Sequence, residues 1–193
     1  MHATLALMEP VLFLPLPGIR PLRRVEYDKM VELGMFQDER IELLRGVLVP
    51  MSPIGPPHSG TIDRLNRLLV LALEGVATVR VQNPFAALDD SEPEPDFSVV
   101  PLGDYRAAHP ERAELVIEVA DSSLSRDRGV KLHIYAENGV PEYWIVNLRD
   151  RRIEVHTDPS PDGYRTQRTV EPGETLSPSR FPAIAFDVRD IVG

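Results

Sequence analysis

The sequence predicts a mixed α/β domain in which a central sheet is flanked by helices. Its 193 residues suffice for one domain with a sizeable core, and they show no internal repeat or linker. Residues 115–120 (LVIEVA) form a nearly continuous apolar run, which is typical of a strand buried on both faces. Residues 59–74 instead repeat apolar side chains at helical spacing. Helical and strand-like segments therefore alternate along one chain.

We expect an irregular N-terminal arm over residues 1–24 and one folded domain over residues 25–193. Four prolines interrupt the apolar pieces of the arm, and its arginines follow those pieces, which is the wrong order for a signal peptide. No apolar run approaches the roughly 20 residues of a membrane-spanning helix. The sequence therefore predicts a cytoplasmic protein with no membrane partner.

The first half of the domain is predicted to contain two helices and a hairpin. Residues 25–33 suit a short helix that a glycine ends. Residues 41–51 predict a hairpin, because two apolar pieces, IELL and VLVPM, flank an Arg-Gly pair. A proline-rich loop then leads to the helix of residues 59–74, which another glycine ends.

The second half is predicted to be richer in strands. A strand over 76–82 is followed by an acidic loop over 89–96 and a short apolar strand over 97–100. The buried strand 115–120 precedes a helix over 126–137, which Asn-Gly closes. The last expected strands form a meander and cover 141–148, 152–157 and 164–170.

The composition excludes several classes of protein. The chain has no cysteine, so disulfides, thiolate nucleophiles, zinc–thiolate sites and iron–sulfur clusters are ruled out. Any metal must bind to oxygen or imidazole ligands. The formal net charge of -9 argues against a protein that coats nucleic acid electrostatically. It still allows an enzyme that meets phosphate through a metal in a local pocket.

Glu118 is the most informative single residue. Alternate residues of a strand share a face, so Val116, Glu118 and Ala120 are expected to point the same way. A carboxylate in this apolar strand is costly to bury unless it is paired or binds a metal. An ion pair with an arginine is the simpler interpretation. A hard cation held by oxygen ligands on a rigid strand is the functional one.

Asp96 is the natural partner of Glu118, because it stands where the acidic loop turns into an apolar strand. As an isolated residue it is explained better by a role as a loop cap or turn residue. The acidic residues around it are interpreted most simply as a solvated loop: Asp89, Asp90, Glu92 and Glu94.

Lys131 completes a possible set of site residues. Asp127, Lys131 and Tyr135 follow one another at four-residue spacing, which places them on one helix face. Helical side chains lean toward the N-terminus, so Lys131 can reach back toward the strand that carries Glu118. A lysine beside carboxylates and a metal can orient a water or stabilise phosphate charge. A solvated surface lysine is the alternative.

These residues carry a resemblance to a known family. The segment EPDFSVV, followed by ELVIEVADSSLSRDRGVKLHIYAENGVPEYWIVNL, resembles a large bacterial family of restriction-endonuclease-like proteins with a PD-(D/E)xK-type core. The stretch IELLRGVLVPMSP, with the histidine and helix after it, is similar to the N-terminal half of that family. The likeness covers roughly residues 25–192. It implies a central mixed sheet flanked by helices, of the restriction-endonuclease type.

The resemblance also implies roles for single residues. Asp96 and Glu118 match the metal-binding acids, for Mg²⁺ with Mn²⁺ as a substitute. The position two residues after Glu118 usually holds a lysine in the wider superfamily, and here it is Ala120. Lys131 matches a lysine that has moved to the following helix. Glu42 matches an additional acid near the metal.

Other residues have simpler interpretations. Gln82 is expected to be a hydrogen-bonded strand residue, with lining of the site as the alternative. His58 is expected to pack at a helix entry, with contact to phosphate as the alternative. Tyr143 and Trp144 are expected to pack in the core. The arginines that could supply a local basic surface are Arg20, Arg23, Arg24, Arg126 and Arg128.

The sequence thus predicts a metal-dependent DNA endonuclease that hydrolyses phosphodiester bonds and acts as a homodimer or higher homo-oligomer. Two other functions stay open. One is a noncatalytic module of the same fold that serves assembly or interaction, which the alanine at 120 and the acidity favour. The other is a metal-dependent hydrolase of a smaller phosphodiester. A cleft that brings together Asp96, Glu118 and Lys131 would favour either enzyme.

Overall fold

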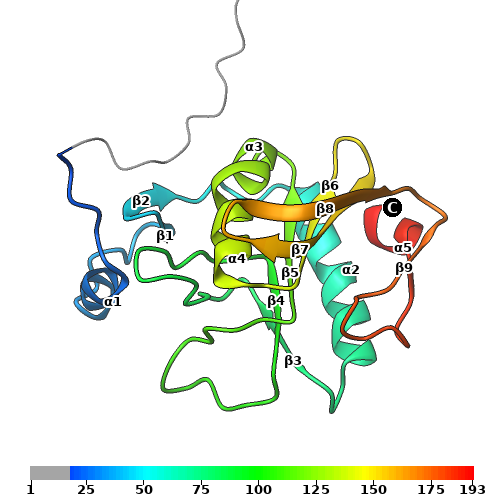
Figure 1. The fold of residues 1–193 in the computed structure, drawn as a ribbon, viewed down its shortest axis with the longest axis horizontal. Helices are drawn as coiled ribbons and strands as arrows, with labels where there is room; N and C mark the ends of the chain where they lie inside the picture. The colour runs from blue at the N-terminus through cyan, green and yellow to red at the C-terminus, as the bar shows by residue number, and fades with distance from the viewer. Residues whose placement is uncertain (1–17) are drawn as a thin grey trace, which may run out of the picture.

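A six-stranded mixed sheet forms the centre of the molecule, as seen in a computed structural model that describes residues 18–193 (Figure 1). Its strand order is β3-β4-β5-β6-β7-β8. The pair β5 and β6 is parallel, and all other neighbours are antiparallel. The strands are β3 (Thr78–Val81), β4 (Phe97–Val100), β5 (Leu115–Ala120), β6 (Glu142–Asn147), β7 (Arg152–Ser160) and β8 (Gly163–Val170).

Helices cover both faces of this sheet, which confirms the predicted fold class. On one face, α2 (Pro56–Ala72) and the short α5 (Val188–Val192) share an apolar cluster with one set of alternate residues of β5. On the other face, α4 (Leu132–Asn138) packs against the remaining alternate residues. The crossover from β5 to β6 runs through α3 (Leu124–Arg126), the π-helical segment η1 (Asp127–Lys131) and then α4.

The predicted N-terminal helix and hairpin are both present. They are α1 (Arg24–Glu32), β1 (Ile41–Leu44) and β2 (Val47–Pro50). The turn requires glycine at Gly46, where φ is 74° and an added Cβ would lie 2.3 Å from the Cβ of Pro21. Most of the arm expected over residues 1–24 lies outside the described residues, which begin at residue 18.

The C-terminal part contains elements that the sequence patterns did not indicate. The strands β9 (Thr175–Leu176) and β10 (Phe186–Asp187) pair with each other, and α5 follows directly. These elements are two to five residues long. Hydrophobic periodicity cannot be recognised over such short segments.

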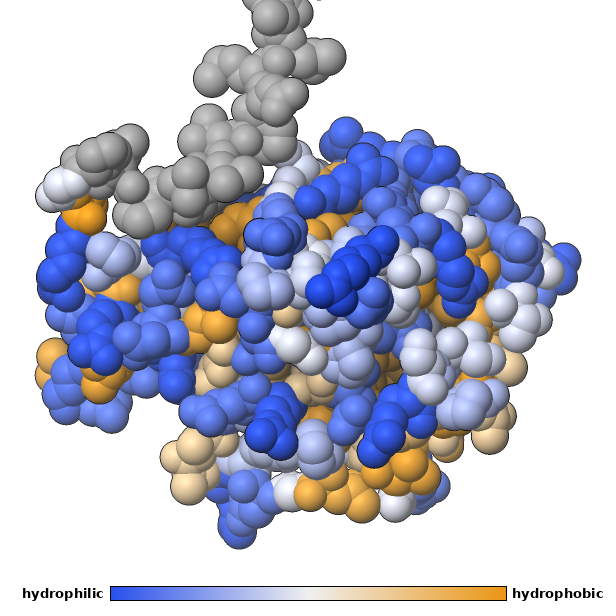
Figure 2. Space-filling model, in the orientation of Figure 1, coloured by the Kyte–Doolittle hydropathy of each residue, from blue (hydrophilic) through white to orange (hydrophobic). Residues whose placement is uncertain are grey.

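The core and the surface divide as expected for a folded domain. Tyr143 and Trp144 are fully buried, which confirms their predicted packing role. The face of the molecule in Figure 2 is mostly hydrophilic, and apolar residues lie on it in small separate groups. Such scattered apolar exposure is ordinary for a protein surface.

The acidic loop before β4 is not uniformly solvated, so that expectation was wrong. Glu92 is buried, and its backbone pairs with Leu43 of β1 through bonds of 2.8 and 3.2 Å. Burial, with the negative charge of Asp28 nearby, raises the pKa of Glu92 to about 7. The loop is therefore a packed connection between the hairpin and the sheet.

Glu92→Gln is expected to stabilise the protein above pH 7 and to matter less in acid. The folded state binds the Glu92 proton more tightly than the unfolded state, so wild-type stability falls as pH rises from 4.5 to about 7. The neutral amide removes this loss, which is about 1–3 kcal/mol. Urea denaturation of both proteins at several pH values tests this. Parallel pH dependences in the two proteins would contradict it.

Candidate active site

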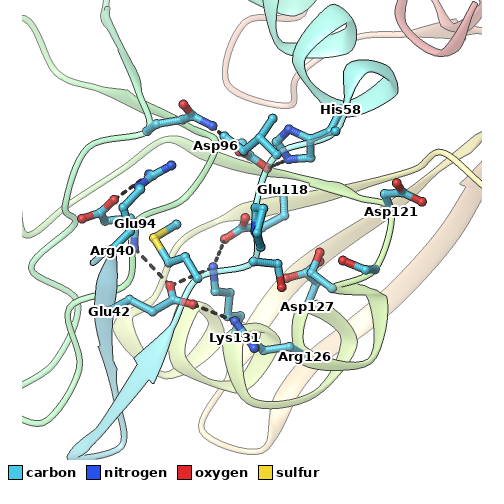
Figure 3. Close-up of a pocket in the computed structure, with 18 residues that line it drawn as sticks. Arg40, Glu42, His58, Glu94, Asp96, Glu118, Asp121, Arg126, Asp127 and Lys131 are labelled. Carbon is cyan, nitrogen blue, oxygen red and sulfur yellow. Dashed lines mark hydrogen bonds and ion pairs between the residues drawn. The ribbon is translucent and has the colours of Figure 1, made fainter. Parts of the chain in front are cut away.

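One pocket brings together all four predicted site residues (Figure 3). Glu42 comes from β1, Asp96 directly precedes β4, Glu118 lies in β5 and Lys131 ends η1. The pocket is also lined by residues of the loop before α2, of the first turn of α2 and of the segment after β5. Residues that are 89 positions apart in the sequence, from 42 to 131, thus share one cavity.

Glu118 is held on the face of β5 that the strand pattern predicted, together with Val116 and Ala120. Its side chain is only 6% exposed. Oε1 accepts hydrogen bonds from the Lys131 ammonium at 3.0 Å and from the Tyr135 hydroxyl at 2.7 Å. Burial raises the pKa of Glu118 well above its ordinary value, and the charge of Lys131 opposes this effect. The partner of this acid is a lysine, and not the arginine of the simpler interpretation.

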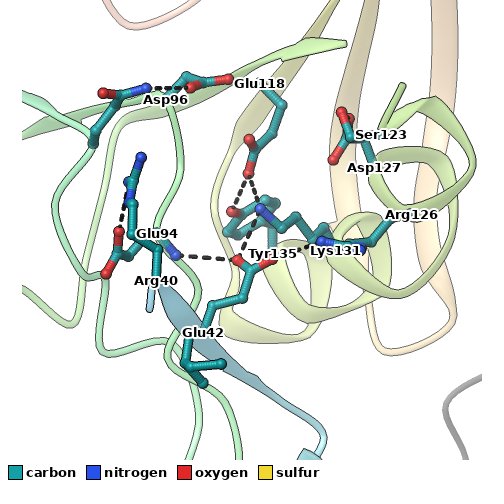
Figure 4. Close-up of polar contacts among 12 residues, drawn as sticks. Arg40, Glu42, Glu94, Asp96, Glu118, Ser123, Arg126, Asp127, Lys131 and Tyr135 are labelled. Carbon is teal, nitrogen blue, oxygen red and sulfur yellow. Dashed lines mark hydrogen bonds and ion pairs between the residues drawn. The ribbon is translucent and has the colours of Figure 1, made fainter. Parts of the chain in front are cut away.

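Lys131 is a buried cation between two carboxylates (Figure 4). Its Nζ lies 3.0 Å from Glu118 Oε1 and 2.9 Å from Glu42 Oε2. Burial alone would lower the pKa of Lys131, but the charges of Glu118 and Glu42 outweigh burial and raise it. Lys131 therefore stays protonated inside the pocket and is not a solvated surface lysine.

The helix that carries Lys131 is less regular than expected. Instead of one α-helix over 126–137, the chain is kinked within η1 at Gly129, whose φ and ψ of -101° and -108° are not helical. Asp127 and Lys131 still line the pocket, and Tyr135 still reaches Glu118. The predicted common face is thus confirmed, although a kink interrupts the helix.

Both carboxylate oxygens of Glu42 contact cationic side chains. Its Oε2 contacts Lys131, and its Oε1 accepts from Arg126 at 3.4 Å. The side chain is 1% exposed. With both oxygens engaged by cations, Glu42 is placed to position Lys131.

Asp96 is fixed by three donors from separate elements. Its Oδ2 accepts from the backbone N–H of Val119 at 2.8 Å and lies 3.2 Å from His58 Nε2. Its Oδ1 accepts from Gln82 Nε2 at 3.2 Å. His58 and Gln82 both line the pocket. The hydrogen bond with Asp96 raises the pKa of His58 despite the opposing effect of burial. His58 therefore contacts the site, which its simpler packing role did not include. Gln82 is hydrogen-bonded as expected, but it follows the end of β3 and binds Asp96 in the pocket.

Asp127 is a further ionisable group in the pocket, and the sequence indicated only its helix face. It is buried, and Oδ2 accepts from the Ser123 hydroxyl at 2.6 Å. Oδ1 has no hydrogen-bond partner among the described residues. Burial raises the pKa of Asp127 to about 6, against the charge of Lys131. The four-residue spacing to Lys131 was the available signal.

The pocket holds more negative than positive charge. Four of its acids are buried, and Lys131 is its only buried cation among the described residues: the acids are Glu42, Asp96, Glu118 and Asp127. Uncompensated buried carboxylates are costly, so a bound cation fits this donor set. Within residues 18–193, no three His, Cys, Asp or Glu side chains lie close enough to enclose a metal alone. Mg²⁺ commonly uses one or two carboxylates and completes its shell with water and substrate phosphate.

The arginines that were expected to form a basic surface are each paired with an acid. Arg126 contacts Glu42 in the pocket, and Arg128 contacts Glu154. The N-terminal arginines are paired within the outer part of the fold: Arg20 with Glu26, Arg23 with Asp89, and Arg24 with Glu111. These ion pairs offset the charge that the arginines would otherwise present to a polyanion.

The fold and the pocket define the class of protein, which is restriction-endonuclease-like. A structure described as "Crystal structure of a putative nuclease belonging to DUF820 from Anabaena variabilis ATCC 29413" matches with a TM-score of 0.70 and 14% sequence identity. The match covers 89% of this chain and 98% of that chain, and it shows a shared fold. A family model described as "Uma2: Putative restriction endonuclease" matches residues 24–189. The chain belongs to the Uma2 family. No curated protein matches it.

In the described part of the chain, no helix is both long and apolar enough to cross a bilayer.

Proposed function

We propose that this protein is a Mg²⁺-dependent endonuclease that hydrolyses phosphodiester bonds in DNA. The observation that carries the proposal is the convergence of Asp96, Glu118 and Lys131 in one pocket with an excess of buried carboxylates. Membership of the Uma2 family agrees with this chemistry. A noncatalytic module has no need to bury this surplus of negative charge.

Asp96 and Glu118 are the residues that would hold the cation. A divalent cation supplies Lewis-acid stabilisation of phosphate charge and lowers the pKa of a water. Tyr135 and Lys131 orient Glu118 through Oε1, which leaves Oε2 for the cation. The Lys131 ammonium can hold the attacking water or a phosphate oxygen, because its charge is maintained by two carboxylates. Glu42 keeps that ammonium in place.

A metal-dependent hydrolase of a smaller phosphodiester is the second candidate. It is favoured by the pairing of all five candidate arginines with acids. Long nucleic acids are normally met by a surface of unpaired basic side chains. A small substrate needs charge compensation only inside the pocket.

Cleavage of supercoiled plasmid by the wild-type protein tests the main proposal. We expect nicking in Mg²⁺ or Mn²⁺ and none in EDTA, with activity that falls as salt is raised. Calorimetric titration with each cation measures binding independently of turnover. A small chromogenic diester, bis(p-nitrophenyl) phosphate, is assayed in parallel.

The three functions give different results in these assays. Plasmid nicking supports the endonuclease, and turnover of the small diester alone supports the second candidate. Absence of both cleavage and cation binding would support the noncatalytic module and overturn the proposal.

A further inference from the structure

We infer that His58 is a metal ligand beside Asp96, so that the cation site contains one imidazole nitrogen and prefers a first-row transition metal such as Mn²⁺ over Mg²⁺. The inference rests on the proposed function, which places a divalent cation at Asp96. It adds a ligand from α2 to a site otherwise made by the sheet.

The separation between the two side chains fits a shared cation. His58 Nε2 lies 3.2 Å from Asp96 Oδ2, and both residues line the pocket (Figure 3). Two ligands that bind one metal at about 2.1 Å in adjacent octahedral positions lie roughly 3.0 Å apart. The distance between His58 Nε2 and Asp96 Oδ2 in the cation-free protein is therefore close to the distance between two neighbouring ligands of an octahedral metal. A cation can take the place of the proton between these atoms.

Asp96 keeps the bonding capacity that a shared cation needs. Oδ2 accepts one hydrogen bond from Val119 N–H, and a second lone pair of this oxygen faces His58. Gln82 holds Oδ1 from the opposite side of the carboxylate group. Such outer donors fix the orientation of a ligating carboxylate.

His58 is held rigidly and can offer Nε2 as a ligand. The helix α2 begins at Pro56 and Pro57, whose fixed φ angles favour a helix start. The side chain of His58 is 15% exposed. Among the described residues, Nδ1 has no hydrogen-bond partner. The Asp96 carboxylate can only accept, so Nε2 carries the proton in the cation-free protein. A cation that binds Nε2 displaces this proton and leaves the neutral imidazole with its proton on Nδ1.

The donor set then decides which cation binds best. Mg²⁺ prefers oxygen ligands and dehydrates reluctantly. An imidazole nitrogen favours first-row transition metals over Mg²⁺. With the His58 nitrogen beside the Asp96 carboxylate, the site is expected to bind Mn²⁺ more tightly than Mg²⁺.

Electron paramagnetic resonance of Mn²⁺ bound to the full chain tests this ligand directly. A pulsed experiment on the wild type is expected to show hyperfine coupling to ¹⁴N, which changes to ¹⁵N coupling after histidine labelling. His58→Gln should lose this coupling and weaken Mn²⁺ binding by about 10- to 100-fold. His109→Gln is the control, because His109 is exposed and does not line the pocket. Thermal melting of each variant verifies folding.

The outcomes separate this inference from the proposed function. Bound Mn²⁺ without nitrogen coupling in the wild type, or with coupling that persists in folded His58→Gln, would overturn the role of His58 and leave the proposed function standing. Failure of the wild type to bind either Mn²⁺ or Mg²⁺ would overturn the cation site and His58 with it. Coupling that disappears only in His58→Gln supports the inference.

Discussion

Glu118→Gln is expected to lower cleavage by about 10²- to 10³-fold while leaving the metal-free protein at least as stable as the wild type. The amide removes one of four buried negative charges in the pocket and can still accept hydrogen bonds from Lys131 and Tyr135. It is a poor ligand for a hard cation, so cation binding and turnover should fall together. Plasmid cleavage, calorimetry and urea denaturation measure the three quantities.

Glu142→Gln is the matched control for this substitution. Glu142 is also a buried acid of the central sheet, but it lies outside the pocket and accepts from Trp144 Nε1 and Ser179 N–H. The two donors bond to different oxygens of Glu142, whereas a glutamine side chain has only one acceptor oxygen. One donor therefore loses its partner, so stability should fall by about 1–3 kcal/mol while cleavage is retained. Loss of stability in Glu118→Gln with unchanged cleavage would show that Glu118 is a structural acid.

Lys131→Met is expected to cost about 3–5 kcal/mol of unfolding free energy, besides abolishing cleavage. The substitution keeps the length of the side chain but leaves Glu118 and Glu42 buried without the ammonium that lies within 3.0 Å of both. Urea denaturation in EDTA measures the loss in stability. Adding Glu118→Gln to this variant should recover part of it, because the carboxylate of Glu118, which has lost its cationic partner, is then replaced by a neutral amide.

The sequence contains only one other lysine, which makes a natural control. Lys29 pairs with Glu32 on α1, and both side chains are 65% exposed. Exposed pairs of this kind contribute little, so Lys29→Met should leave the denaturation midpoint unchanged. If both lysine variants had the same midpoint as the wild type, the buried ion pair could not be a determinant of the fold.

Local patterns in the sequence were enough to predict the sheet, the helices and the central acid of the site. Glu118 is conspicuous because a charge interrupts an apolar strand, and its face follows from the two-residue period. Lys131 and Tyr135 reach the same carboxylate because four-residue spacing stays on one side of a helix. Short C-terminal elements escaped prediction because no period develops over so few residues.

Tertiary structure alone decided how the acids and cations are paired. Glu42 meets Arg126 across 84 positions of sequence, and Asp96 meets His58 across 38. The burial of Glu92 depends likewise on a hairpin that packs against its loop. The sequence by itself determined the strand and helix faces on which Glu118 and Lys131 lie, because strand and helix periods are local properties. Their partners, burial and charge balance were decided only when the crossover of the sheet brought distant segments into one pocket, because these properties depend on long-range packing.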